Sequence, residues 1–156
     1  MKATNDISEV YQTWNTSYLL NISIIDKQHV IFFNLFDKLK ILNNKDDSYD
    51  ELFEVIEELE KYTNTHFKTE EALMRKANAL EFEMHLEQHG IFIKKVEEFK
   101  TAYRYKNSVL LEQMINFMRK WFLMHIAEVD GKYVDSVQEY LTNKDGKSNQ
   151  LEHPVL

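Results

Sequence analysis

The 156-residue chain contains no cysteine, only three glycines and a single proline. The absence of cysteine excludes disulfide bonds, thiolate zinc sites and iron–sulfur clusters held by thiolates. Because glycine and proline interrupt helices, their scarcity allows most of the chain to be helical. No apolar run approaches the roughly 20 residues that span a bilayer, and the N-terminus shows no apolar segment typical of a secretory signal. We therefore expect a cytoplasmic protein that does not enter a membrane.

Basic residues are also in the minority. The chain has 19 Lys and Arg against 26 Asp and Glu, a formal net charge of −7. Nucleic acids and anionic membrane surfaces bind to basic patches, so neither is expected as a partner. Hydrophobic residues make up 44% of the chain, enough for one folded domain with its own core.

The chain does have four long stretches with apolar residues three and four positions apart, the spacing of one helical face. These stretches cover residues 26–42, 49–76, 80–104 and 109–130, and a further helical piece is expected over 133–141. Asp26 is the expected cap of the first helix, and Gly131 permits an end or a bend after the fourth. Short polar turns between long helices imply antiparallel neighbours. We predict an all-α fold, an up-down-up-down antiparallel four-helix bundle over residues 26–135.

Two segments flank the predicted bundle. Residues 1–25 form an N-terminal arm, which is too apolar to be free and is expected to pack on the bundle. Residues 136–156 form a C-terminal extension, in which the polar stretch 142–156 is expected to be loose.

Histidine is the informative component of this chain, because five of its six histidines continue the apolar stripes of the predicted helices. Residues four apart lie about 40° apart around a helix axis, so His66 and Glu70 project together, as do His85 and His89. Imidazole and carboxylate together suit iron, zinc, copper or manganese, and more than four ligands exceed one tetrahedral zinc. We therefore predict two near-octahedral ions, with iron as the metal, that share bridging carboxylates. The candidate ligands are His29, His66, Glu70, His85, His89, His125 and Asp130.

One of these candidates fits an ideal helix poorly. Asp130 stands five positions after His125, which corresponds to a rotation of roughly 140° on an α-helix. Asp130 is therefore expected to reach the centre only from the edge of its stripe. The sixth histidine, His153, stands beside the proline in the tail and is not expected to bind metal.

Four strings of residues resemble the hemerythrins, in particular the bacterial single-domain ones. The strings are Asp26-Lys27-Gln28-His29, His66-Phe67-x2-Glu70-Glu71-x2-Met74, His85-x3-His89 and Trp121-x3-His125-Ile126-x3-Asp130. The resemblance covers about residues 10–135 and matches all seven candidate ligands.

The resemblance implies a non-haem di-iron centre that binds O2 reversibly. It assigns His85, His89 and His125 to one iron, and His29 and His66 to the other, which keeps an open position for O2. Glu70, Asp130 and an oxide or hydroxide would bridge the two irons. An apolar pocket would protect bound O2 from water, and the residues that flank the ligands are the candidates for its lining: Phe67, Trp121, Phe122 and Ile126.

Three functions remain open from the sequence. The first is O2 storage, delivery or sensing without enzymatic activity. The second is a di-iron enzyme that acts on O2, peroxide or nitric oxide. Ferritin-like di-iron sites carry Glu-x2-His motifs, which none of the four helical histidine segments contains, so O2 binding is favoured. The third, a metal-free interaction bundle, would leave the inward histidines unexplained.

Overall fold

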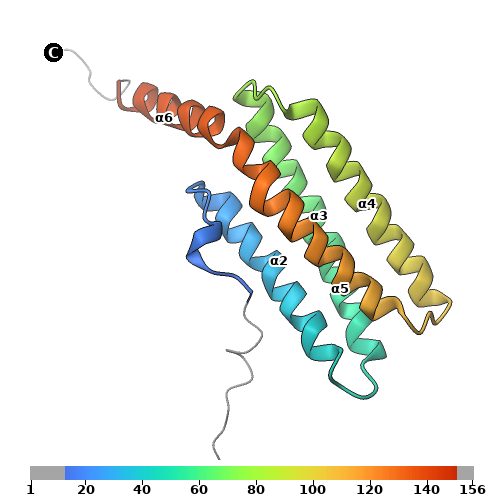
Figure 1. Cartoon of the computed structure of the whole chain (residues 1–156). Helices are drawn as coiled ribbons and strands as arrows, with labels where there is room; N and C mark the ends of the chain where they lie inside the picture. Colours follow the sequence, from blue (N-terminus) through green and yellow to red (C-terminus); the bar gives the residue numbers. More distant parts are fainter. Residues whose placement is uncertain (1–12, 151–156) are drawn as a thin grey trace, which may run out of the picture.

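The computed structural model describes the backbone of residues 13–150 and the side chains of residues 13–146. Within these residues the fold is all helical and contains no strand (Figure 1). A short 3-10 turn, η1 (Thr16–Tyr18), precedes the long helices α2 (Ser23–Leu42), α3 (Tyr49–Lys76), α4 (Phe82–Arg104) and α5 (Leu110–Trp121). The chain then continues through a π-helical segment, η2 (Phe122–Val129), a 3-10 turn, η3 (Asp130–Tyr133), and α6 (Val134–Gln150).

The four long helices form the predicted up-down-up-down bundle, in which each helix runs antiparallel to the one before it (Figure 1). The helix pairs α2–α3, α3–α4, α4–α5 and α2–α5 are all in contact, so the bundle is closed. None of the helices within residues 13–150 combines the length and apolarity needed to cross a bilayer.

Three predicted helix boundaries were wrong. The first helix begins at Ser23, three residues earlier than predicted. Ile22 and Ile25 are buried, and this packing stabilises the additional turn. Asp26 therefore does not cap the helix, and its carboxylate instead accepts a hydrogen bond from the Leu20 amide (2.7 Å), which ties the arm to α2. The third helix begins at Phe82 rather than at Leu80, whose side chain is 95% exposed.

The third error lies at the end of the fourth helix. The α-helix α5 ends at Trp121 rather than at Asp130, and the backbone continues through η2 and η3 into α6. The chain changes direction between α5 and α6 (Figure 1), and Gly131 lies in η3 between them, which agrees with the bend that Gly131 was expected to permit. The second helix was predicted correctly at both ends, and Asn78 forms the expected break after it with a left-handed backbone (φ 52°).

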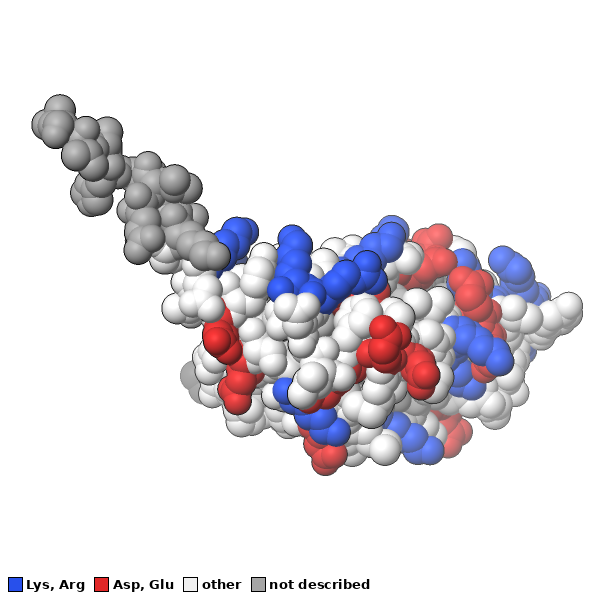
Figure 2. All heavy atoms as spheres, turned by 90° about the horizontal axis from the view of Figure 1, so that it is seen from above, with Lys and Arg blue, Asp and Glu red and all other residues white. Residues whose placement is uncertain are grey.

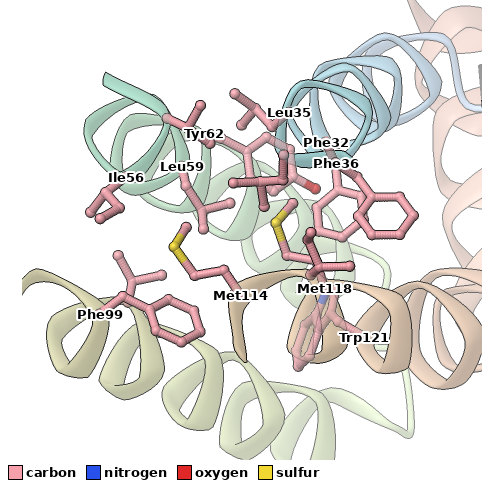
Figure 3. Packing of buried hydrophobic residues seen from close by; sticks show 14 of the residues in the cluster. Phe32, Leu35, Phe36, Ile56, Leu59, Tyr62, Phe99, Met114, Met118 and Trp121 are labelled. Carbon is pink, nitrogen blue, oxygen red and sulfur yellow. The ribbon is translucent and has the colours of Figure 1, made fainter. Parts of the chain in front are cut away.

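The main core lies between the four helices and consists of aromatic and aliphatic side chains from all of them (Figure 3). Phe32, Leu59, Phe92 and Met118 are buried completely or almost completely in it. From the arm, Trp14 and Tyr18 pack against this core. The arm therefore covers the bundle over its described residues 13–22, and residues 1–12 lie outside the described part of the chain.

A second, smaller core holds α6 to the bundle. Ile22 and Ile25 meet Met74, Tyr133 and Val137 there, and Leu141 packs against the group. This packing explains why the polar segment expected to be loose is helical as far as Gln150, since a docked helix is readily extended by residues that contain no proline. The last six residues lie outside the described part.

Charged side chains of both signs share the face seen from above in Figure 2. Lys and Arg gather along one edge of this face, and acidic side chains lie among and below them. The net charge of −7 is therefore not concentrated on this face.

Candidate metal centre

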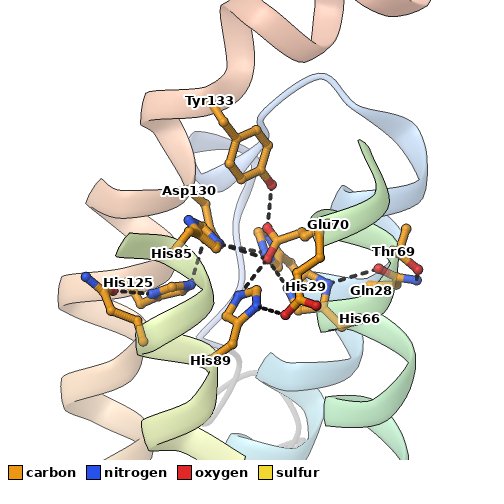
Figure 4. A network of polar contacts seen from close by, with 12 residues as sticks. Gln28, His29, His66, Thr69, Glu70, His85, His89, His125, Asp130 and Tyr133 are labelled. Carbon is orange, nitrogen blue, oxygen red and sulfur yellow. Dashed lines mark hydrogen bonds and ion pairs between the residues drawn. The ribbon is translucent and has the colours of Figure 1, made fainter. Parts of the chain in front are cut away.

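All seven candidate ligands lie together in the upper part of the bundle, between the two cores (Figure 4). The helix α2 contributes one histidine, α3 a histidine and Glu70, α4 two histidines, and the η2–η3 segment a histidine and Asp130. None of these residues is more than 2% exposed: His29, His66, Glu70, His85, His89, His125 and Asp130.

The Glu70 carboxylate is the shared centre of the cluster. Its Oε2 atom lies 3.1 Å from His89 Nε2, 3.2 Å from His85 Nε2 and 3.4 Å from His66 Nε2. Its other oxygen, Oε1, accepts a hydrogen bond from the hydroxyl of Tyr133. Glu70 therefore faces histidines from its own helix and from α4 at the same time.

The Asp130 carboxylate occupies a matching place on the other side. Its Oδ1 atom lies 3.0 Å from His125 Nε2 and 3.3 Å from His85 Nε2, and its Oδ2 atom lies 3.1 Å from His29 Nε2. Asp130 thus connects α2 with α4 and with its own segment.

The donor atoms form two overlapping groups, each with all its donor atoms within 4.8 Å of one another. One group contains Glu70 with three histidines, and the other contains Glu70 and Asp130 with two histidines: Glu70, His85, His89 and His125, and then His29, His66, Glu70 and Asp130. Two groups that share a carboxylate agree with the three-plus-two division of histidines that the family resemblance implies.

The donor atoms are close together, yet several of them make no hydrogen bond. The two nitrogens of His29, the Nε2 atoms of His89 and His125, and both oxygens of Asp130 are buried without a hydrogen-bond partner among the described residues. Unpaired polar groups in a core are costly. Nitrogen and carboxylate lone pairs that converge without hydrogen-bond geometry suit cations, so this donor set fits a pair of metal ions.

The backbone explains how Asp130 reaches the centre. The segment after Trp121 is π-helical, and the Asp130 amide bonds the carbonyl of His125, five residues earlier. A turn closed by five residues instead of four places these two residues almost above one another. The edge position expected for Asp130 assumed an ideal α-helix and was wrong for that reason.

Three of the histidines have a polar side chain against their Nδ1 atom. None of these polar side chains was predicted from the sequence as a site residue. His66 Nδ1 faces Gln28 Oε1 (2.9 Å), and His89 Nδ1 faces Glu71 Oε1 (2.8 Å). The third pair, His125 Nδ1 and Gln88 Oε1, is 2.7 Å apart.

Such partners fix the ring orientation of a ligand histidine and leave its Nε2 atom free to bind metal. Each of the three partners is next to a candidate ligand in the sequence or one helical turn from it, and this adjacency is the signal that could have identified them. Tyr133 was also missed, because it follows the irregular segment.

The protonation states favour metal binding at several of these groups. Burial lowers the pKa of His66 to about 4, so its ring is neutral. Burial alone would raise the pKa of Glu70, yet the nearby histidines, His66 foremost, hold it well below its usual range. Burial also disfavours the charged form of His29, but the carboxylate of Asp130 outweighs this and raises the His29 pKa. Ionised carboxylates and a neutral imidazole are the forms in which these groups bind metal.

The four residues predicted to line an O2 pocket are all buried in the main core. Phe67 stacks on His89, with ring centroids 3.7 Å apart, and Trp121 stacks on His125 at 4.0 Å. Phe122 lies 5.0 Å from Phe33 between ring centroids and also contacts Tyr18 of the arm. The fourth residue, Ile126, is 2% exposed.

A closed helical bundle with clustered histidines and carboxylates in its core defines a class of candidate metal-binding bundle proteins. Within this class, the family model described as Hemerythrin HHE cation binding domain matches residues 20–136. A bacteriohemerythrin of Clostridium acetobutylicum is 32% identical over 126 residues, which cover 78% of this chain and 98% of that protein. The chain therefore belongs to the hemerythrin family.

Other relatives agree with this assignment. A bacteriohemerythrin of Pseudomonas paraeruginosa is 28% identical over 131 residues, 83% of each chain. Another from Campylobacter jejuni is 27% identical over 128 residues, which cover 81% of this chain and 96% of that protein.

Proposed function

We propose that the protein is a non-haem di-iron protein that binds O2 reversibly. In this proposal His85, His89 and His125 hold one iron, and His29 and His66 hold the other. Glu70 and Asp130 bridge the two irons, together with an oxide or hydroxide. The observation that carries the proposal is the pair of donor groups that share Glu70, with buried nitrogen and oxygen atoms that lack hydrogen-bond partners.

The iron pair supplies the electrons that reversible O2 binding requires. The polypeptide supplies five imidazoles and only two carboxylates, and this low anionic charge disfavours the high-valent iron needed to cleave O2. The apolar side chains Phe67, Trp121, Phe122 and Ile126 keep water from the centre, which protects bound O2 from displacement. The family membership and the relatives named bacteriohemerythrin support this proposal.

Metal content is the first test. After expression with sufficient iron, the purified protein should contain about two irons per chain, because two donor groups are present and each suits one ion. A value near one, or zinc in preference to iron, would count against the proposal. His85→Ala should lower the iron content. His153→Ala, at a histidine that lies outside the described residues, should not lower it.

O2 binding is the second test. The reduced protein should develop a visible absorption band on exposure to O2 and lose it when O2 is removed. The enzymatic alternative predicts a different result, continuous O2 consumption with a reductant and no stable O2-dependent spectrum. Stopped-flow spectroscopy combined with an oxygen electrode separates the two.

A further inference from the structure

Tyr62 carries a buried hydroxyl that forms no hydrogen bond with any described residue. The side chain is 5% exposed, and its hydroxyl has no hydrogen-bond partner among the described residues. A phenylalanine would fill nearly the same space without burying an unsatisfied polar group, which costs folding free energy. The hydroxyl therefore points to a partner outside the described residues.

Tyr62 lies next to the candidate metal centre, so a hydrogen-bond partner for its hydroxyl could be bound there. Tyr62 lies one helical turn before His66 on α3, and the two rings stack with centroids 5.0 Å apart and planes 17° apart. His66 directs Nε2 toward Glu70, 3.4 Å away. Figure 3 shows the Tyr62 oxygen directed from α3 across the core toward α2, not toward solvent. The hydroxyl thus lies in the layer of the core directly below His66.

Tyr62 belongs to the main apolar core. Phe32 of α2 lies against Tyr62, with ring centroids 5.8 Å apart. The hydroxyl is therefore held in an apolar part of the protein, where an unpaired polar group is costly.

The two sides of the centre differ in the rings that stack on their histidines. On the three-histidine side, Phe67 stacks on His89 and Trp121 on His125. On the two-histidine side, the ring stacked on His66 is Tyr62. Of these three stacked rings, that of Tyr62 is the one with a hydroxyl. Asp130 Oδ1 also lies 3.0 Å from His125 Nε2. A shared Asp130 would give the three-histidine side five protein donors and the two-histidine side four, so an incoming ligand would bind on the two-histidine side.

We propose that the Tyr62 hydroxyl donates a hydrogen bond to a small ligand, O2 or an anion such as azide, bound on the His29 and His66 side of the centre. This inference rests on the proposed di-iron function. It assigns Tyr62 the role of a ligand-binding residue that sets how tightly and for how long a small ligand is held.

The test compares Tyr62→Phe with Tyr49→Phe. Tyr49 is the matched control, because its hydroxyl has a partner, the carbonyl oxygen of Tyr103, at the far end of the bundle. In Tyr62→Phe, O2 should dissociate from the reduced protein about fivefold faster, and azide should bind the oxidised protein about tenfold more weakly, as expected for one lost hydrogen bond. Both variants should retain about two irons, one for each donor group.

Denaturant unfolding of the iron-free protein gives a second, independent readout. The unfolding midpoint of Tyr62→Phe should equal or exceed that of the wild type, because an unsatisfied hydroxyl is removed. The midpoint of Tyr49→Phe should fall, because a hydrogen bond is lost. If Tyr62→Phe falls as far as Tyr49→Phe, the hydroxyl has a partner in the chain and the inference is overturned.

The ligand measurements separate this inference from the function on which it rests. If the wild type binds neither two irons nor O2, the proposed function fails. If the wild type binds both but Tyr62→Phe leaves O2 dissociation and azide affinity unchanged, the function stands and the role of Tyr62 is overturned.

Discussion

At the scale of single residues, the histidines of the centre differ in what holds their outer nitrogen atoms. His66 and His125 face the amide oxygens of Gln28 and Gln88, whereas His89 faces the carboxylate of Glu71. A carboxylate acceptor makes an imidazole more electron-rich than an amide does, and so a stronger metal ligand. Glu71 should therefore contribute to iron affinity although its side chain does not reach the centre.

Glu71→Ala should lower iron affinity by about 10- to 100-fold, the usual effect of removing such a partner. Competition with a chelator of known affinity would measure the change. Glu57→Ala is the matched control, because Glu57 lies on the same helix and is exposed. Equal iron affinity in the Glu71 variant and the control would show that the His89–Glu71 pair does not support the metal.

Phe122 should protect the centre from water. Phe122→Ala removes a ring that packs on Phe33 and Tyr18, so water gains access and the O2-dependent spectrum should decay faster as the iron is oxidised. Phe99→Ala removes another buried ring, 2% exposed against 7% for Phe122, outside the set predicted to line the pocket. Both variants should lose about 3–5 kcal/mol of stability, but only Phe122→Ala should speed the decay. Equal decay rates in the two variants would exclude Phe122 from the pocket.

At the scale of secondary-structure elements, the π-helical segment Phe122–Val129 decides whether Asp130 faces the centre. It adds one residue to a turn, which rotates everything after it by about 100° relative to an α-helix. The same rotation determines the direction of the Tyr133 side chain, whose hydroxyl donates a hydrogen bond to Glu70. It also determines the direction in which α6 begins. The irregular backbone therefore positions two groups of the candidate centre together.

Deleting Ala127, an exposed residue of this segment, should convert it to regular α-helix and place Asp130 four residues after His125, so that both still face the centre. Inserting one alanine after Ala127 should instead rotate Asp130 by about 100° away from His29 and His125. The iron content should be preserved in the deletion variant and fall by at least about half in the insertion variant, while far-UV circular dichroism remains helical in both. Equal iron content in the two variants would show that the register of Asp130 relative to His125 is not needed.

The sequence predicted the elements with a regular 3.6-residue period and failed where the period changes. The whole of α3, Tyr49–Lys76, could be predicted because its apolar stripe is unbroken. The end of the fourth helix could not be predicted, because the π turn shifts the helical period by one residue. The candidate ligands could be predicted because they continue apolar stripes. Gln28, Glu71 and Gln88 were missed, because each lies beside its apolar stripe, and only their adjacency to a candidate ligand could have identified them.

At the scale of the whole molecule, the centre joins all four helices of the bundle and lies between its two cores. The iron-free protein holds two buried carboxylates whose pKa values are lowered, because neighbouring histidines outweigh the effect of burial. The same carboxylates raise the pKa values of His29 and His85 against the effect of burial. Without metal, protons on His29 and His85 would balance part of the negative charge of Glu70 and Asp130. In the iron-loaded protein, the two cations would neutralise this charge instead.

Removal of iron should therefore destabilise the entire bundle. A ligand present at about 100 times its dissociation constant adds about 2.7 kcal/mol to folding, and a protein of this size loses about 2–4 °C in Tm per kcal/mol. Iron removal with a chelator should thus lower the Tm by roughly 5–10 °C, and adding ferrous iron back without O2 should restore it. Differential scanning calorimetry would measure both changes. His89→Ala serves as a check, because in the iron-free state it should cost much less stability than in the iron-loaded state. An unchanged Tm after complete iron removal would show that the metal does not hold the four helices together.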